Sequence, residues 1–495
     1  LLIPSKNRVS HNQYFGLEDD NQYGLIVNSE IVDITNGAPF EENGVWYLPF
    51  STLYYEISDA FYYDGLALLY TDPLQTYSAT PGESFYTDSD GIKYTLTYQP
   101  CYFKDGSLCI ALDYLKLMDY SYYTVDDTMK SIWVFNDWSE QPRASLLKDT
   151  KARTQAGIKN DIVASLATGD VVTVLEQGAS WSQVQTQTGL IGYVQNKMLG
   201  EITEEAKAVP DGRPLPKYTN IAMDEMVVMG WHQVFSESGY SQLDDIISTA
   251  KGMNVICPTW FTIKDNDGNI QNLGEKKYVT KAHKAGLQVW VMLDDINIST
   301  DGLQVFGTTS HRKTLITAVI DAVTELGADG ITLDVETIKS DVGPSYIQFI
   351  RELSAACRKE KLVLSVDNYS PMPHTAFYDR TQQGQVVDYV VVMAYDEHYN
   401  GSEAGSTASF PFVENGIANT IAQGVPADRI ICAVPFYSRI WHGDGSSVSS
   451  ETISMPNMQA YIAEHGLTPV WEDDIAQNYV EYTVEEGTLN RIWVK

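Results

Sequence analysis

The sequence predicts a large (β/α)8 barrel, the TIM-type fold, preceded by a small all-β barrel and an N-terminal α+β repeat module. Three observations predict this order: an internal repeat near the start, a glycine-rich stretch of alternating apolar and polar residues, and a long alternation of strand and helix patterns. At 495 residues the chain exceeds one ordinary domain. We expect a repeat module at residues 1–140, a small barrel at 143–201, a linker at 202–220 and the large barrel at 221–495.

The N-terminal segment contains one structural layout twice. NGVWYLPFSTL (43–53) and DGSLCIALDYL (105–115) each have a turn ending in glycine, an apolar strand and the start of a helix. Each is followed by a short apolar strand, LALLYTD and KSIWVFN, so a unit of strand, tight turn, strand, short helix and strand explains both. The layout resembles the stalk module named for the N-terminal domain of copper amine oxidases. That resemblance implies a spacer or wall-contact role and no copper.

Residues 143–201 alternate apolar and polar residues in short runs broken by glycine, which is typical of a small barrel. The residues Arg153, Gly169-Asp170-Val171-Val172, Trp181, Val184, Gly189 and Gly192-Tyr193-Val194 resemble the bacterial Src-homology-3-like domain. The resemblance implies binding to cell-wall peptidoglycan; alternatively, the domain is a spacer with Trp181 in its core. The following stretch, EEAKAVPDGRPLPKYTN, has three prolines and mixed charge, which suits a semi-rigid linker.

From residue 221 onward, apolar runs alternate with helical patterns. The runs are MVVMGWHQV (226–234), MNVICPTWF (253–261), LQVWVML (287–293), GITLDVE (330–336), LVLSVDNY (362–369), YVVVMAYD (389–396) and RIICAVPFY (429–437). Continuous hydrophobic strands between helices indicate a parallel sheet covered on both faces, and seven of them favour a barrel over an open sheet. No GxGxxG follows a strand, which argues against a doubly wound fold. We find no eighth strand: either the barrel is incomplete, or the final run NRIWVK closes it in an unusual way.

Composition excludes several classes of protein. The formal net charge of −32 argues against a nucleic-acid partner and against docking on anionic lipid. No apolar run reaches the roughly 18 residues of a membrane span. No cysteine or histidine cluster has zinc spacing, and DNDGNI (265–270) lacks the glycine and glutamate offsets of a calcium loop, so we interpret it as a hairpin turn. We therefore expect no metal and no cofactor.

Two further features bear on the compartment of the protein. Cys101 and Cys109 lie symmetrically about Asp105, so in a hairpin they could face each other and pair; alternatively both are free thiols, which suits an odd total of five cysteines. The chain opens LLIPSKNRVS without a methionine, which we interpret as the mature part of an exported protein. We accordingly expect an extracellular, surface or cell-wall location.

The stretch GADGITLDVE (327–336) carries the candidate site. Alternate strand residues share a face, so Thr332, Asp334 and Glu336 point together into the barrel, with Glu336 at the carboxyl rim. The Cα atoms of the two acids are expected roughly 7 Å apart. Carboxylates held that close cannot both ionise freely, so one pKa rises and a general acid becomes available near neutral pH. The alternative is an exposed strand edge with solvated acids.

DGITLDVE resembles the DxxDxDxE signature of glycoside hydrolase family 18, the chitinase-like family. VVMAYDEHYNG (391–401) resembles its MxYD strand and AVPFYSRIW (433–441) its PFYxR strand, while GWHQVF (230–235) and PTWF (258–261) resemble strands of its wall-lytic, spore-associated branch. The resemblance implies a retaining hydrolase of polymers containing N-acetylglucosamine, in peptidoglycan or spore cortex. Two alternatives stay open: a chitinase, and a wall-binding protein without catalysis.

The resemblance also implies roles for single residues. Glu336 would be the general acid, Asp334 would orient the substrate acetamido group and stabilise its positive charge, and Tyr395 would hydrogen-bond the acetamido carbonyl as it attacks the anomeric carbon. Asp396 and Arg439 would line the sugar pocket, and Trp231, Trp260 and Trp441 are candidates for stacking on sugars or, alternatively, for the core. Thr332 replaces the middle aspartate of the signature, and threonine can donate a hydrogen bond but cannot hold the charge. We interpret His398 as a structural residue.

Overall fold

The computed structural model describes residues 3–296, 299–443, 448–484 and 487–494. Two compact units make up the chain: Leu1–Thr71 with Gln75–Lys217, and Tyr218–Lys495 with Asp72–Leu74. Within the described ranges, no helix is both long enough and apolar enough to cross a bilayer.

The predicted repeat in the first unit is present as two hairpins, each followed by a short helix. The first has β3 (Phe40–Glu42), β4 (Val45–Pro49) and α2 (Phe50–Glu56); the second has β10 (Cys101–Lys104), β11 (Ser107–Ala111) and α3 (Leu112–Met118). Strands β4 and β11 pair antiparallel, so both hairpins join one sheet of order β10-β11-β4-β3. Their Asn-Gly and Asp-Gly turns adopt positive φ at both central residues, which these residue pairs tolerate best.

The segments after the two helices differ. Strands β5 (Phe61–Tyr63), β6 (Leu68–Thr71), β7 (Thr76–Ala79), β8 (Phe85–Asp88) and β9 (Lys93–Thr95) form a sheet of their own. By contrast, β12 (Tyr122–Asp126) and β13 (Ser131–Phe135) join β1 (Gly24–Val27) and β2 (Glu30–Val32). LALLYTD and KSIWVFN, which occupy the same place in the predicted repeat, therefore belong to different sheets, because each strand pairs with whichever neighbour covers its apolar residues.

The hairpin β10–β11 does not bring Cys101 and Cys109 together. Asp105 and Gly106 form a two-residue turn that pairs Lys104 with Ser107, so Cys101 lies opposite Ile110 and Cys109 opposite Tyr102. A shift of one residue turns the two thiols to opposite faces of the sheet, because side chains alternate along a strand. The pairing that we considered from the sequence is therefore wrong, and all five cysteines are free.

Thiol labelling tests this register. Unfolded but unreduced protein is expected to take up five equivalents of alkylating reagent, because all five thiols are free. In the folded protein only Cys432 is exposed, and burial raises the pKa of Cys101 to about 12 and of Cys109 to about 11, which suppresses their reactive thiolates. Mass spectrometry should show one fast and four slow sites; a disulfide-linked peptide containing Cys101 and Cys109 would contradict the register.

The seven-stranded sheet of the first unit is the predicted small barrel. Its strands are β14 (Glu140–Leu146), β15 (Thr150–Arg153), β16 (Ile162–Leu166), β17 (Val171–Gln177), β18 (Trp181–Gln185), β19 (Ile191–Gln195) and β20 (Leu199–Ala206), in the order β16-β15-β19-β18-β17-β14-β20. Its core is built from small aliphatic side chains, including Val172, Val184 and Val194. Trp181 stays half-buried and lines a surface hollow with Glu176 and Tyr193.

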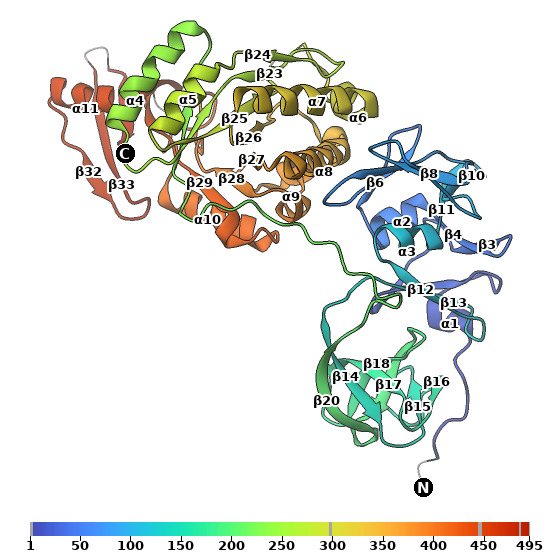
Figure 1. Ribbon diagram of the computed structural model, residues 1–495. Helices are drawn as coiled ribbons and strands as arrows, with labels where there is room; N and C mark the ends of the chain where they lie inside the picture. Colours follow the sequence, from blue (N-terminus) through green and yellow to red (C-terminus); the bar gives the residue numbers. More distant parts are fainter. Residues whose placement is uncertain (1–2, 297–298, 444–447, 485–486, 495) are drawn as a thin grey trace. The chain divides into compact units, whose positions relative to one another are not determined.

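Seven parallel strands form the main sheet of the second unit, one from each predicted run. They are β21 (Met229–His232), β22 (Val255–Pro258), β25 (Gln288–Asp294), β26 (Gly330–Asp334), β27 (Val363–Tyr369), β28 (Tyr389–Met393) and β29 (Ile430–Ala433), hydrogen-bonded in that order. The sheet is curled as in a barrel (Figure 1), which confirms the predicted fold class. Within the described residues it stays open, with β21 and β29 at its two edges.

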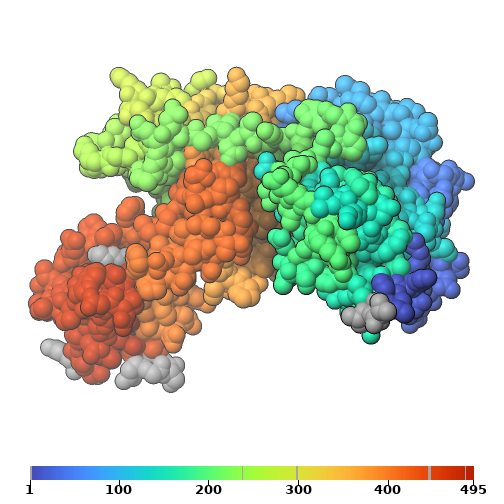
Figure 2. All heavy atoms as spheres, turned by 90° about the horizontal axis from the view of Figure 1, so that it is seen from below, coloured from blue at the N-terminus to red at the C-terminus, as the bar shows by residue number. Residues whose placement is uncertain are grey.

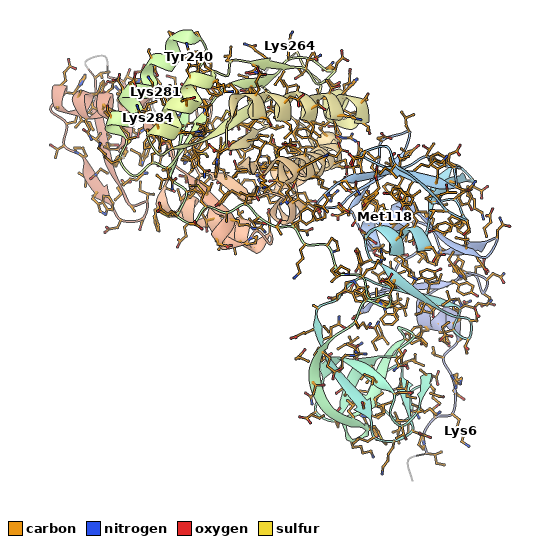
Figure 3. All side chains as sticks on the ribbon, viewed as in Figure 1. Lys6, Met118, Tyr240, Lys264, Lys281 and Lys284 are labelled. Atoms are coloured by element: carbon orange, nitrogen blue, oxygen red, sulfur yellow. The ribbon has the colours of Figure 1, made fainter. Side chains whose placement is uncertain are left out.

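Helices cover the outer face of this sheet. They are α4 (Leu243–Thr249), α5 (Lys276–Lys284), α7 (Thr309–Leu326), α8 (Gly343–Glu360), α9 (Arg380–Val386) and α10 (Phe410–Ala422). The buried Arg312 of α7 binds both carboxylate oxygens of Glu352 on α8, at 3.0 Å each. On the surface, Lys281 of α5 binds Asp244 of α4 at 2.9 Å; Figure 3 labels this lysine. DNDGNI forms the turn between β23 (Phe261–Ile263) and β24 (Ile270–Asn272), as predicted.

The C-terminal residues form an antiparallel sheet rather than an eighth barrel strand. The elements are β30 (Tyr437–His442), β31 (Ser449–Ser454), α11 (Met455–Glu464), β32 (Val470–Glu472), β33 (Gln477–Thr483) and β34 (Leu489–Val494). Strand β34, which contains the run NRIWV, pairs with β30 and β33, so it does not close the barrel. Its buried residues alternate with half-buried ones, as in a sheet covered on one face. Figure 2 shows these residues, in red, as one lobe.

Candidate active site

The predicted acids lie at the carboxyl end of β26. Thr332 is fully buried and shares a hydrogen bond of 2.9 Å with Ser365 Oγ on β27. Two residues further along, Asp334 ends the strand half-buried, and Glu336 follows it, also half-buried. The alternate residues Ile331, Leu333 and Val335 belong to the hydrophobic core. The alternation that the sequence predicted is therefore the arrangement found.

Glu336 is held in place by a carboxylate on the neighbouring strand connection. Asp295, which directly follows β25, accepts a hydrogen bond of 2.8 Å from the backbone N–H of Glu336. It also accepts from the backbone N–H of Thr337 at 3.0 Å and from its hydroxyl at 2.8 Å. One residue earlier, the buried Tyr378 hydroxyl donates to the carbonyl of Val335 at 2.9 Å. These contacts fix the chain where it leaves the sheet, so the direction of the Glu336 side chain is set.

Removing this support should cost both stability and activity. Asp295→Ala removes the buried carboxylate that accepts from the backbone N–H groups of Glu336 and Thr337, so the free energy of unfolding is expected to fall by about 1–3 kcal/mol. A displacement of Glu336 should also lower kcat by about tenfold or more. Urea unfolding and turnover measurements check both effects, and Asp295→Asn, which keeps one acceptor oxygen, should lose less. Equal stability of wild type and Asp295→Ala would contradict this role.

Neighbouring carboxyl groups help to raise the pKa of Asp334 and of Asp294 at this edge of the sheet. Asp294 is the register partner of Asp334, and Asp295 and Glu336 lie beside the pair. Burial and then the negative charges of Glu336, Asp294 and Asp295 raise the pKa of Asp334 to about 7. Burial likewise raises the pKa of Asp294. The raised pKa that the sequence predicted for one acid therefore falls on Asp334, and within the described ranges no group of three potential ligands is arranged to hold a metal ion.

Tyr395 belongs to the same site. It follows β28, and its pKa is raised by burial and then by the negative charges of Asp367, Asp334 and Glu336. Such mutual effects require these groups to be close, and a raised pKa keeps the tyrosine hydroxyl protonated as a donor. The structure thus brings together the three predicted catalytic residues, from two different strands.

The predicted sugar-binding residues divide into two groups. Next to Tyr395, the exposed Asp396 adopts a positive φ of 55° and accepts a hydrogen bond of 2.7 Å from the Tyr437 hydroxyl. Arg439 of β30 lies near it, with 3.9 Å between Arg439 Nη2 and Asp396 Oδ1. Trp231 of β21 is half-buried and interacts with the Asp367 carboxyl group. Asp396 and Arg439 therefore lie next to each other beside Tyr395, and Trp231 contacts a carboxyl group of the site; their sugar-binding role stays a prediction.

Trp260 and Trp441 do not lie at a surface that could bind sugar. Trp260 is 1 % exposed and packs edge-on against Tyr278, with ring centroids 5.0 Å apart. Trp441 is fully buried, and its indole N–H donates to the carbonyl of Gly405 at 2.9 Å. Neither ring has an exposed face for stacking, so both are core residues, a correction to the sugar-stacking role considered above. A strand-end tryptophan can pack on either side of the sheet wall, and only the tertiary neighbours decide which.

Sequence reasoning missed four polar residues of the site: Asp294, Asp295, Asp367 and Tyr369. Asp367 and Tyr369 lie on β27, and burial followed by hydrogen bonding to Glu336 raises the pKa of Tyr369. Part of the signal was available, because Asp367 and Tyr369 in LVLSVDNY have the same two-residue spacing as Asp334 and Glu336, and LQVWVMLDD ends its strand with two consecutive acids.

A curled parallel sheet with carboxyl groups and a tyrosine at the carboxyl ends of its strands defines a barrel enzyme site of the glycoside hydrolase class. The comparisons with known proteins agree. Residues 190–494 match the family model "Glycosyl hydrolases family 18", and residues 148–200 match "Bacterial SH3 domain". The chain belongs to glycosyl hydrolase family 18.

Individual relatives share 28% or less of their aligned residues with this chain. The chain is 28% identical over 200 residues to the putative sporulation-specific glycosylase YdhD of Bacillus subtilis (strain 168), covering 38% of this chain and 46% of that protein. It is 26% identical over 254 residues to the uncharacterized glycosylase YvbX of the same organism, covering 49% and 73%. A solved C-terminal domain of a putative chitinase from Desulfitobacterium hafniense DCB-2 superposes with a TM-score of 0.50 at 19% identity. The match covers 54% of this chain and 86% of that domain, and it supports the fold. The chain thus spans about half the length of YdhD.

Proposed function

We propose that the protein is a retaining glycoside hydrolase that cleaves polymers containing N-acetylglucosamine, with the acetamido group of the substrate as nucleophile. The observation that carries this proposal is the grouping of Asp334, Glu336 and Tyr395 at one edge of the sheet. A general acid, a carboxylate for an amide N–H and a neutral hydroxyl donor are the groups that such a reaction requires.

The reaction uses each group at a different atom. Glu336 transfers a proton to the glycosidic oxygen as its bond to C1 breaks, and the acetamido oxygen forms a new bond to C1. Tyr395 donates its O–H toward that oxygen and orients it for attack. Asp334 accepts the acetamido N–H and, when ionised, offsets the positive charge that develops on the nitrogen. Water then attacks C1 from the face left by the departing sugar as the bond between C1 and the acetamido oxygen breaks, which restores the acetamido group. The water gives a proton back to Glu336, and the two displacements together retain the original configuration.

Cell-wall material is the substrate that we propose. The bacterial SH3 domain and the sporulation-specific name of one relative both favour peptidoglycan or spore cortex, and a location outside the cell or on the spore. The half-buried Trp181, in a hollow with Tyr193 and Glu176, offers an aromatic contact for a wall peptide. The net charge of −32 suits a protein that diffuses among wall polymers without binding nucleic acid.

The test is cleavage of defined wall fragments. The full protein is incubated with peptidoglycan glycan strands, cortex fragments and chitin oligomers, and new reducing ends are identified by mass spectrometry. Cleavage on the reducing side of N-acetylglucosamine, together with resistance of the same glycans after N-deacetylation, is the expected result. Equal cleavage of acetylated and deacetylated strands would contradict substrate assistance, and a preference for chitin would make the protein a chitinase.

One observation favours a second candidate function, a wall-binding protein without turnover. Thr332 stands where the family signature has an aspartate, and it is engaged with Ser365 rather than with an acid. Co-sedimentation with purified walls, with no new reducing ends after long incubation, would support this candidate over the hydrolase.

A further inference from the structure

Asp367 is a buried carboxyl group without an ordinary partner. It lies on β27 with 1 % of its surface exposed, and among the described residues neither of its carboxyl oxygens has a hydrogen-bond partner of regular geometry. The Trp231 side chain is the one group whose contact favours the ionised form. A buried, unpartnered carboxylate would cost several kcal/mol, so a group in this position keeps its proton.

The sheet register places Asp367 beside Asp334. In the pairing of β26 with β27, Thr332 aligns with Ser365, and these side chains touch at 2.9 Å. Asp334 and Asp367 are each two residues further along the same strands, so both project from the same face, one level higher. The Oδ1 atom of Asp334 is also buried and, within the part of the chain that the structure describes, has no partner. A protonated carboxyl group can donate a hydrogen bond to a carboxylate oxygen beside it.

We propose that Asp367 is a positioning residue, which stays protonated and donates its carboxyl O–H to Oδ1 of Asp334. This inference rests on the proposed function. In it, strand β27 supplies a carboxyl group beside Asp334, whereas β26 has Thr332 where the family signature has an aspartate. The donor fixes the rotamer of Asp334 toward the substrate and stabilises its ionised form while charge develops on the acetamido nitrogen. Asp367 itself touches no reacting atom in this scheme.

The surroundings of Asp367 are otherwise acidic or neutral. The titratable groups that interact with it are Asp334 at the end of β26, Glu336 just after it, Cys257 of β22, Tyr346 of α8 and Tyr395 after β28. None of these is a cation that could neutralise a carboxylate. Burial, followed by the charges of Asp334 and Glu336, raises the pKa of Asp367 well above its ordinary value.

Two substitutions test whether Asp367 acts as a protonated hydrogen-bond donor, as a negative charge or only as a packed side chain. Asp367→Asn keeps a neutral donor of the same shape, so kcat is expected to stay within about threefold of wild type. In this variant, the change of kcat/KM with pH that reports the ionisation of Asp334 should also stay near pH 7. Asp367→Leu fills a similar volume without a donor, so kcat should fall at least about tenfold and that change of kcat/KM should move about one pH unit upward.

Three results would overturn the proposal. If Asp367→Leu matches wild type in kcat and pH profile, the residue is only packing. If both folded variants lose activity equally, the donor has no role. If Asp367→Asn moves the ionisation of Asp334 to lower pH, Asp367 carries a charge in the wild type.

A measurement without substrate separates this proposal from the proposed function. Infrared spectra of the folded protein at about pH 9 should show the C=O stretch of a protonated carboxyl group, and Asp367→Asn should lack it. Absence of the band from wild type would overturn the proposal. If instead the band is present but no glycan is cleaved, the proposed function fails while the assignment of the proton stands.

Discussion

Replacing Glu336 by glutamine is expected to lower kcat on wall glycans by about a thousandfold or more. Glutamine has the same shape and keeps the backbone contact with Asp295, but it has no proton to give to the leaving oxygen. Stability and glycan binding should change little, because the side chain is half-buried and its neighbours stay in place. Turnover and equilibrium binding on the same glycan check this separation.

The leaving group provides the sharpest control. A substrate with an activated aryl leaving group needs little protonation, so Glu336→Gln should lose far less activity on it than on the natural glycan. Asp341→Asn is a matched variant, since this exposed acid follows the same strand without joining the cluster, and it should behave as wild type. Equal losses on both substrates would show that Glu336 is not the general acid.

Replacing Asp334 by asparagine is expected to reduce kcat by about a hundredfold to a thousandfold. Asparagine can still accept the acetamido N–H, but it cannot offset the positive charge on the nitrogen. The loss should appear in kcat more than in KM, because the charge develops only as the acetamido group attacks. Unchanged kcat in Asp334→Asn would contradict the substrate-assisted scheme.

The same substitution should make the protein more stable at alkaline pH. The pKa of Asp334 is about 7 in the folded protein and has its ordinary value of 3.8 in the unfolded chain. The folded state therefore binds the extra proton between these values, and wild-type stability falls as pH rises from about 4 to 7. At about pH 8, Asp334→Asn should exceed wild type by about 2–4 kcal/mol, and near pH 4 the difference should vanish. Urea unfolding at both pH values checks the sign.

The sequence by itself determined the local features that depend on neighbouring residues. Alternation along GITLDVE predicted that Asp334 and Glu336 share a face, because side chains alternate along any strand. Glycine after Asn43 and Asp105 predicted the two hairpins, since such turns need a positive φ. The order of seven apolar runs predicted the parallel sheet, because buried parallel strands are apolar on both faces.

Only the tertiary structure decided what depends on register and on neighbours distant in the chain. A turn of two residues placed Cys101 and Cys109 on opposite faces, and packing buried Trp260 and Trp441. The pairing of β26 with β27 put Asp367 beside Asp334, a proximity that no spacing in the sequence encodes. These outcomes depend on which segments pack against each other. The free energy of burial is gained only when two surfaces come into contact, so the sequence of one segment does not determine it.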